Sequence, residues 1–82
     1  MEIVWGEPKR LANIDKHGLD FADLTLTFFE SAVVIAAKRT RFQAIGRLAD
    51  GTITVIFARL GTEGLSVISM RPAKTTERRL LP

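Results

Sequence analysis

The sequence contains no cysteine and only one histidine. The lack of cysteine excludes a disulfide framework and thiolate metal or redox sites, and one histidine excludes a cluster of histidine ligands. The longest apolar run, residues 32–37, falls far short of the roughly 20 residues that a transmembrane helix needs. Glu2 directly follows Met1, so we expect no signal peptide. The composition, 46% hydrophobic and 26% charged over 82 residues, predicts a single folded domain over residues 1–82 that acts in the cytoplasm.

Positive charge is concentrated in the second part of the chain. Residues 1–37 carry three basic and six acidic side chains, whereas residues 38–82 carry nine basic and three acidic ones. Seven of those nine are arginine, whose guanidinium group binds phosphate through paired hydrogen bonds. This asymmetry favours a polyanionic partner, nucleic acid above all. Ordinary solvated surface charge is the alternative interpretation.

The first part of the chain carries helix signals. Residues 1–5 are typical of a short strand. Pro8 favours the first turn of a helix over residues 9–17, and Gly18 is typical of a helix C-cap. Asp20 is a suitable N-cap for a second helix, whose apolar positions 21, 24 and 28 lie at helical spacing.

Four strands are expected after the two helices, over residues 31–37, 41–48, 52–60 and 65–71. The first is continuously apolar, as a strand buried on both faces would be. Pro72 ends the last strand, and Thr75 or Thr76 is suited to cap a terminal helix that contains Glu77. The predicted fold class is therefore α+β, with two N-terminal helices packed on a mostly antiparallel β-sheet meander and a C-terminal helix.

Hairpin register predicts where the arginines lie. A two-residue turn at Asp50-Gly51 pairs Arg47 with Thr54, and a four-residue loop over 61–64 pairs Thr54 with Arg71. Side chains opposite one another in antiparallel strands share a face, so these three would form one row. Because like charges in one row destabilise a sheet unless an anion lies between them, we expect a phosphate there.

The same register separates two faces of the sheet. Leu60 would face Leu65 beside the second loop, and Arg41 would project from the face that carries the arginine row. The opposite face would be apolar and covered by the helical pair. Its expected members are Ala44, Leu48, Ile53, Val55, Phe57, Ile68 and Met70.

Three stretches of the chain resemble the BrnT family of toxins. They are residues 5–21, with the pattern Lys-His-Gly-x-x-Phe, residues 41–47, and residues 68–73 followed by Glu77-Arg78. The resemblance implies a RelE-like fold and the toxin half of a type II toxin–antitoxin pair. It also implies an endoribonuclease that cleaves mRNA without a metal or other cofactor and arrests translation. The implied partner is a small DNA-binding antitoxin of the BrnA type, in a heterotetramer of two toxins and two antitoxins.

RNA cleavage without a metal ion uses the ribose 2′-hydroxyl as nucleophile and needs cations around the phosphorane. We expect Arg47 and Arg71 to clamp the phosphate. Arg41 or Arg59 would add a further contact, and Thr54, in the same predicted row, is a further candidate for binding the RNA phosphate.

Proton transfer has fewer candidates. His17 is the first, because histidine titrates near neutral pH, although a histidine at a helix C-terminus is also stabilised there without any catalytic role. Glu77 is a second candidate as base, or a simple helix stabiliser. Lys16 is a candidate phosphate contact. Two positions depart from the family pattern, since Thr40 stands where glutamate is usual and Gly6 where aspartate often follows the tryptophan.

Two other classes of function remain open from the residues. A non-catalytic RNA-binding module would keep the arginine face without proton-transfer groups. A partner-docking protein would use the sheet only as a contact surface.

Overall fold

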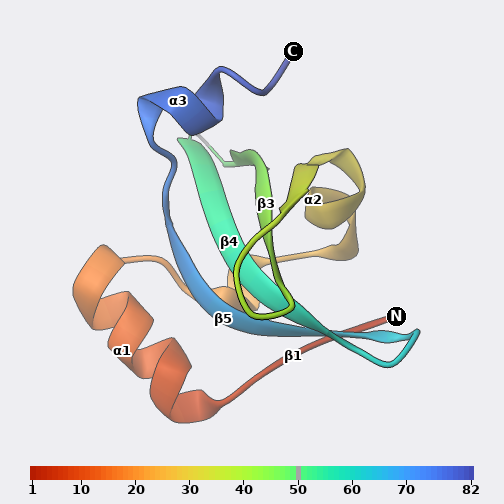
Figure 1. Ribbon diagram of the computed structural model, residues 1–82. Helices are drawn as coiled ribbons and strands as arrows, with labels where there is room; N and C mark the ends of the chain where they lie inside the picture. The colour runs from red at the N-terminus through yellow and green to blue at the C-terminus, as the bar shows by residue number, and fades with distance from the viewer. Residues whose placement is uncertain (50) are drawn as a thin grey trace.

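The computed structural model describes residues 1–49 and 51–82 (Figure 1). The first half of the chain contains strand β1, helix α1, the short 3-10 helix η1, helix α2 and strand β2. The second half contains strands β3, β4 and β5 and the short helix α3. Their bounds are β1 Glu2–Trp5, α1 Glu7–His17, η1 Phe21–Asp23, α2 Leu26–Ser31, β2 Val33–Ala36, β3 Arg41–Leu48, β4 Gly51–Leu60, β5 Gly64–Pro72 and α3 Thr75–Arg78.

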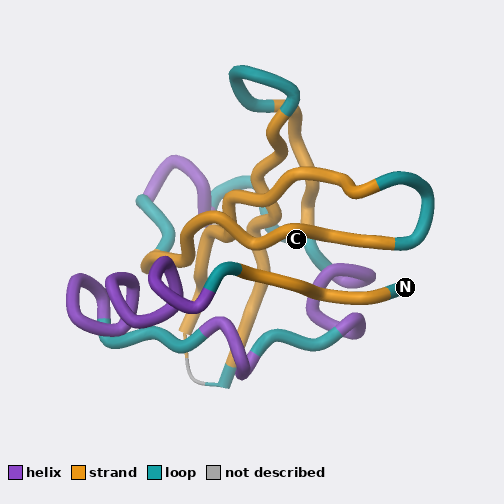
Figure 2. Tube along the Cα trace, turned by 90° about the horizontal axis from the view of Figure 1, so that it is seen from below, coloured by secondary structure: helices purple, strands orange, loops and turns teal. Residues whose placement is uncertain are grey.

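The strands form one five-stranded sheet in the order β1-β5-β4-β3-β2. β1 pairs with β5 in parallel, and the other three pairs are antiparallel. Figure 2 shows the helices arranged around this twisted sheet. The predicted α+β class, with early helices, an antiparallel meander and a terminal helix, is confirmed. Among the described residues, no helix is long and apolar enough to cross a membrane.

The predicted first helix is confirmed, whereas the second is divided. α1 has Pro8 in its first turn and ends at Gly18, whose φ of 69° is left-handed. Asp20 caps only the short η1, accepting a hydrogen bond from the backbone N–H of Ala22 at 2.9 Å. Thr25 then caps α2 by accepting from the backbone N–H of a residue three positions on. Two caps five residues apart start two short helices in place of one.

The apolar run over residues 31–37 is not a strand buried on both faces. β2 covers only Val33–Ala36 and is an edge strand that pairs with β3 alone. Val34 is 43% exposed and Ile35 is 38% exposed. The strand also starts later than predicted, because Ser31 still belongs to α2, where its hydroxyl donates to the carbonyl of Thr27 at 3.0 Å.

The predicted register between β3 and β4 was wrong by two residues. Arg47 faces Thr52, and Leu48 faces Gly51 as the last pair before the turn. Gly51 therefore belongs to the strand, while Ala49 takes the left-handed backbone with φ of 51°. Asp50, the other half of the predicted turn, lies outside the described residues. Because side chains alternate with a period of two, the shift leaves Arg47 on the face that was predicted.

The predicted pair of Thr54 with Arg71 is confirmed, although the loop beside it was misjudged. Leu60 faces Gly64, so the expected pair of Leu60 with Leu65 does not form. A loop one residue shorter would by itself carry Arg71 to the other face.

A β-bulge in β5 corrects the register. Ile56 faces Ser69 while the next residue, Phe57, faces Val67, which leaves Ile68 as the extra residue. Ile68 is therefore only half-buried and does not sit opposite Phe57, as had been expected. Bulges of this kind re-aim the side chains that follow them, and this one turns Arg71 back to the predicted face.

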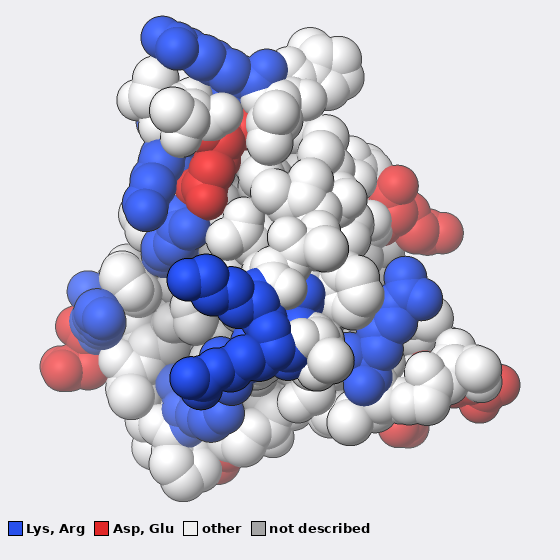
Figure 3. Space-filling model, in the orientation of Figure 1, with Lys and Arg blue, Asp and Glu red and all other residues white. Residues whose placement is uncertain are grey.

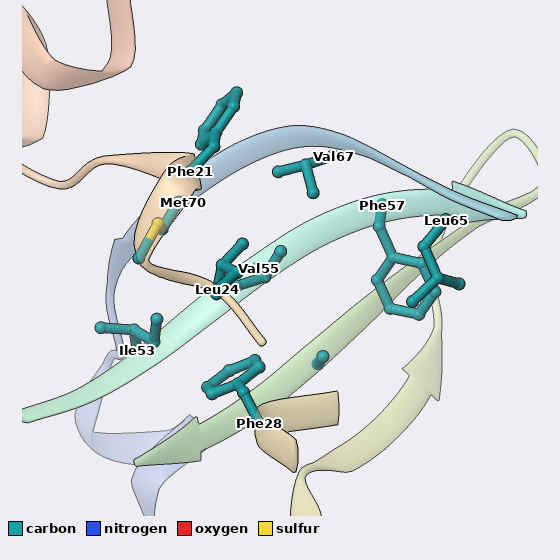
Figure 4. Packing of buried hydrophobic residues seen from close by; sticks show 10 residues of the cluster. Phe21, Leu24, Phe28, Ile53, Val55, Phe57, Leu65, Val67 and Met70 are labelled. Carbon is teal, nitrogen blue, oxygen red and sulfur yellow. The ribbon is translucent and has the colours of Figure 1, made fainter. Parts of the chain in front are cut away.

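The hydrophobic core lies between one face of the sheet and the segment that contains η1 and α2 (Figure 4). The ring of Phe28 packs so closely on β3 that a Cβ at Gly46 would lie 2.9 Å from it. Leu48 packs at the margin of this core. Its buried members include the predicted Ala44, Ile53, Val55, Phe57 and Met70, together with Phe21, Leu24, Phe28, Leu65 and Val67.

Candidate active site

We call the sheet face opposite the hydrophobic core the outer face. Alternation along the strands places Arg41 and Arg47 of β3, Thr54 of β4 and Arg71 of β5 on it. α3 follows β5 and lies on this outer face, where the Glu77 side chain reaches Thr54. Thr54 is buried at 0% exposure, and so is Ile45, its partner on β3.

An ion pair between Arg71 and Glu77 lies where α3 meets the outer face. The two groups meet through both guanidinium nitrogens, with Nη1 to Oε1 at 2.7 Å and Nη2 to Oε2 at 2.8 Å. Oε1 also accepts from the hydroxyl of Thr54 at 2.9 Å and from the backbone N–H of Lys74 at 2.8 Å. The side chains of Arg71 and Glu77 are 21% and 12% exposed. One carboxylate thus joins β4, β5 and the start of α3.

These contacts fix the protonation state of the pair. The pKa of Glu77 is lowered to about 2, chiefly by its hydrogen bonds with Arg71. Burial opposes this shift, whereas the hydrogen bonds from the Lys74 N–H and the Thr54 hydroxyl add to it. The pKa of Arg71 is raised in turn, chiefly by Glu77. A carboxylate with so low a pKa is a poor proton acceptor near neutral pH. The local contacts therefore favour Glu77 as a positioning residue over the expected base.

The anion expected among the arginines is supplied by the protein. We had predicted a phosphate beside Arg71, and the carboxylate of Glu77 fills that position. The sequence reasoning missed this because Glu77 lies on α3, outside the strands whose register was followed. Thr54, expected to contact RNA, is buried and donates its hydroxyl hydrogen to Glu77.

Four further cations are exposed on β3 and on or beside α3. Arg47 donates from Nη2 to the carbonyl oxygen of Pro82 at 3.1 Å, and Lys74, Arg78 and Arg79 lie on or beside α3. We call Arg47, Arg71, Lys74, Arg78 and Arg79 the α3 cation cluster. The site prediction omitted Lys74, Arg78 and Arg79, and the charge imbalance of residues 38–82 was the signal for them.

His17 and Lys16 lie on the last turn of α1. Asn13, one turn earlier, holds α1 to β5, because its Oδ1 accepts from the backbone N–H of Met70 at 3.0 Å and its Nδ2 donates to the carbonyl of Leu19 at 2.9 Å. His17 is half-buried and Lys16 is exposed. Within the described part of the chain, neither side chain makes a hydrogen bond or ion pair with the α3 cation cluster.

Arg59 and Arg41 are not gathered into this cluster. Arg59 faces Leu65, on the core side of the sheet, and its guanidinium stacks 5.2 Å from the ring centroid of Phe42. The alternative of Arg59 as a partner of Arg47 and Arg71 is therefore not supported. Arg41 shares the outer face with Arg47 but lies six residues away on β3, about 20 Å at roughly 3.3 Å per residue.

Comparison with known proteins identifies the class of protein that this fold and cationic face define. Residues 5–77 match the family described as "Ribonuclease toxin, BrnT, of type II toxin-antitoxin system". The fold matches the crystal structure titled "1.1 Angstrom-resolution crystal structure of the Brucella abortus ribonuclease toxin, BrnT", with a TM-score of 0.86 and 55% sequence identity, over 92% of this chain and 99% of that chain. No curated protein matches the sequence.

The protein is accordingly a ribonuclease toxin of a type II toxin–antitoxin system. The chain belongs to the BrnT family, and the resemblance noted in its sequence is confirmed. Membership implies a cognate antitoxin.

Proposed function

We propose that the protein is an endoribonuclease that cleaves mRNA at the α3 cation cluster, without a metal ion, and thereby arrests translation. The observation that carries this proposal is the fixed Arg71 guanidinium with exposed cations around it on one end of the outer face. Cleavage begins when the ribose 2′-oxygen attacks the neighbouring phosphorus. The O2′–P bond forms, the P–O5′ bond breaks, and the products are a 2′,3′-cyclic phosphate and a 5′-hydroxyl.

The cations stabilise the negative charge that builds on the phosphorane. Glu77 occupies one N–H of each terminal nitrogen of Arg71, and Pro72 accepts a further contact from Nη1 at 3.3 Å. Nε–H and the second N–H on Nη2 remain as donors toward a phosphate. Because Glu77 holds the guanidinium in place, Arg71 need not reorganise when charge develops, which is the condition for strong electrostatic catalysis. Arg47 supplies the second, more exposed cation.

Proton transfer is assigned to His17. A base must take the 2′-hydroxyl proton and an acid must give one to the 5′-oxygen, and histidine is the side chain best suited to both near neutral pH. His17 is the only histidine of the chain, and the carboxylate beside the α3 cation cluster, Glu77, already pairs with Arg71. We expect Lys16, its exposed neighbour, to contact the RNA backbone.

Purified protein mixed with RNA in excess EDTA tests this proposal. Wild-type protein should shorten the RNA, and Arg47→Ala should slow cleavage by about 10²–10³-fold, the usual loss for a transition-state donor. Lys9→Ala, which removes one exposed cation from α1, is the matched control and should retain the wild-type rate. Intact RNA with salt-dependent binding would favour a non-catalytic RNA-binding module. Equal loss in both variants would contradict a role for the α3 cation cluster.

We also propose that the cognate antitoxin is a small DNA-binding protein of the BrnA type that covers this cluster. The assembly proposed is a heterotetramer of two toxins and two antitoxins, in the cytoplasm where mRNA is translated. Co-expression with the cognate antitoxin, followed by light scattering, should give the mass of a heterotetramer. A one-to-one heterodimer would contradict the proposed stoichiometry and leave the nuclease proposal intact.

A further inference from the structure

The turn between β2 and β3 has an unusual backbone. Its two central residues, Arg39 and Thr40, both have φ of 60°, and the N–H of Arg41 donates back to the carbonyl of Lys38 at 3.3 Å. Left-handed φ at both central positions is the pattern of a type I′ turn, which normally uses Asn-Gly. Neither residue here is glycine, and Thr40 is β-branched.

This choice of residues is unfavourable for the fold alone. Side chains other than glycine adopt this conformation at a cost in energy, and a β-branched side chain does so least readily. Backbone held in such regions concentrates at functional sites. The turn carries three exposed cations within four residues, at Lys38, Arg39 and Arg41. We call these three the turn cations.

The turn cations lie at the far end of the outer face from the α3 cation cluster. Arg41 starts β3 and Arg47 lies one residue before its end, with Gln43 and Ile45 between them on the same face. Figure 3 shows basic side chains over the β2–β3 turn and around α3 on one visible side of the molecule. The separation of about 20 Å is too large for one phosphate to bridge but suits one strand of a polyanion.

We propose that the turn cations form a second anchor for the RNA backbone, so that the substrate is a single strand laid along β3 from the β2–β3 turn to α3. This inference rests on the proposed nuclease function. At about 3.4 Å per stacked nucleotide, the track between the two anchors spans at most about six nucleotides. Single-strand binding proteins commonly combine such a positively charged track with side chains that contact the bases, and Gln43 offers an amide to a base edge.

The salt dependence of binding measures the proposed contacts directly. The probe is a 2′-O-methyl RNA of about twelve nucleotides, which cannot be cleaved through its 2′-oxygen and covers both anchors. Lys38→Ala and Arg39→Asn should each lower the slope of log K against log salt by about 0.7, the value for one phosphate contact in a single strand. The double variant should lower the slope by about 1.4.

Two turn variants separate binding from folding. Asparagine tolerates left-handed φ, so Arg39→Asn should unfold at a temperature equal to or above that of the wild type while it loses affinity. Thr40→Gly should raise the unfolding temperature and leave the slope unchanged, because it relieves the backbone and keeps all three cations.

Each remaining outcome overturns the inference in a recognisable way. Unchanged slopes, with RNA cleavage still intact, would overturn the second anchor and leave the nuclease function standing. Unchanged RNA slopes combined with weaker antitoxin binding would mean that the turn cations bind the antitoxin, which would also overturn the inference. Absence of both RNA binding and cleavage in the wild type would overturn the proposed function together with this inference.

Discussion

Two arginine–carboxylate clusters in the molecule share their chemistry and differ in their surroundings. Arg10 joins Glu7, with Nε to Oε1 at 2.7 Å, and Asp20, with Nη1 to Oδ2 at 3.1 Å. Arg71 joins Glu77 on the outer face. The Glu7 side chain is 56% exposed, whereas that of Glu77 is 12% exposed and receives two further hydrogen bonds.

The difference shows that burial and hydrogen bonding, more than the ion pair itself, make such a cluster structurally important. Water screens the charges around Glu7, so its ion pair contributes little to stability. The pKa of Glu7 is lowered mainly by Arg10, and that of Asp20 mainly by the backbone N–H of Ala22. At Glu77 the screening is weaker and the contacts are more numerous. That carboxylate fixes both the position of Arg71 and the start of α3.

Removing the buried carboxylate should have the largest effect. Glu77→Gln leaves Arg71 partly buried without its counter-ion, and breaking such a pair is strongly destabilising. We expect the free energy of unfolding to fall by about 2–3 kcal/mol, less than for a fully buried pair. Urea denaturation followed by circular dichroism measures it. A loss below about 0.5 kcal/mol, the range of exposed pairs, would mean that the two clusters are equivalent.

The pH dependence of stability should report the same carboxylate. Since its pKa is lowered from 4.5 to about 2 on folding, Glu77 stabilises the fold fully above its unfolded pKa. That contribution is lost as the pH falls from about 4.5 to about 2. The difference in unfolding free energy between wild type and Glu77→Gln should shrink across this window. A difference that stays constant down to pH 2 would show that the carboxylate is not held as an anion.

The buried hydroxyl should have an intermediate effect. Thr54→Val keeps the side-chain shape and removes one donor to Glu77, which we expect to cost about 1–2 kcal/mol. The pKa of Glu77 should rise, which carbon-13 NMR of its carboxyl group would detect. An unchanged pKa in this variant would remove Thr54 from the network.

The exposed cluster should have the smallest effect. Glu7→Gln removes one carboxylate from Arg10, which retains Asp20, and should change the free energy of unfolding by at most about 0.5 kcal/mol. The measurement is the same urea titration, repeated in high salt, where the remaining effect should vanish. A loss of unfolding free energy as large as that of Glu77→Gln would mean that the two clusters are equally important for stability.

Much of the fold could be predicted because local chemistry decides it. Gly18 supplies the left-handed C-cap, and the alternation over residues 41–48 gives the bounds of β3 as observed. The errors arose where two local signals compete. Thr25 caps a separate helix, α2, which the helical spacing of the apolar residues 21, 24 and 28 does not reveal. Gly51 resembles a turn residue but pairs within β4, while Ala49 takes the strained backbone.

The candidate site could be predicted only in part. Its face was inferred correctly because register errors of an even number of residues preserve alternation, and because a bulge returned Arg71 to its place. Glu77 was identified as a candidate base, but its ion pair with Arg71 was not predicted. Glu77 lies on a helix that follows Pro72, so strand register does not determine its position. Its contact with Arg71 can be known only from the tertiary fold.

A double-mutant cycle on the rate of RNA cleavage tests the central claim most directly, namely that Glu77 serves catalysis by holding Arg71. The rates of wild type, Glu77→Gln, Arg71→Ala and the double variant would be measured in EDTA on folded protein. If Glu77 acts through Arg71, the double variant should be no slower than Arg71→Ala alone. Losses that multiply in the double variant would contradict the account, because Glu77 would then act independently of the guanidinium.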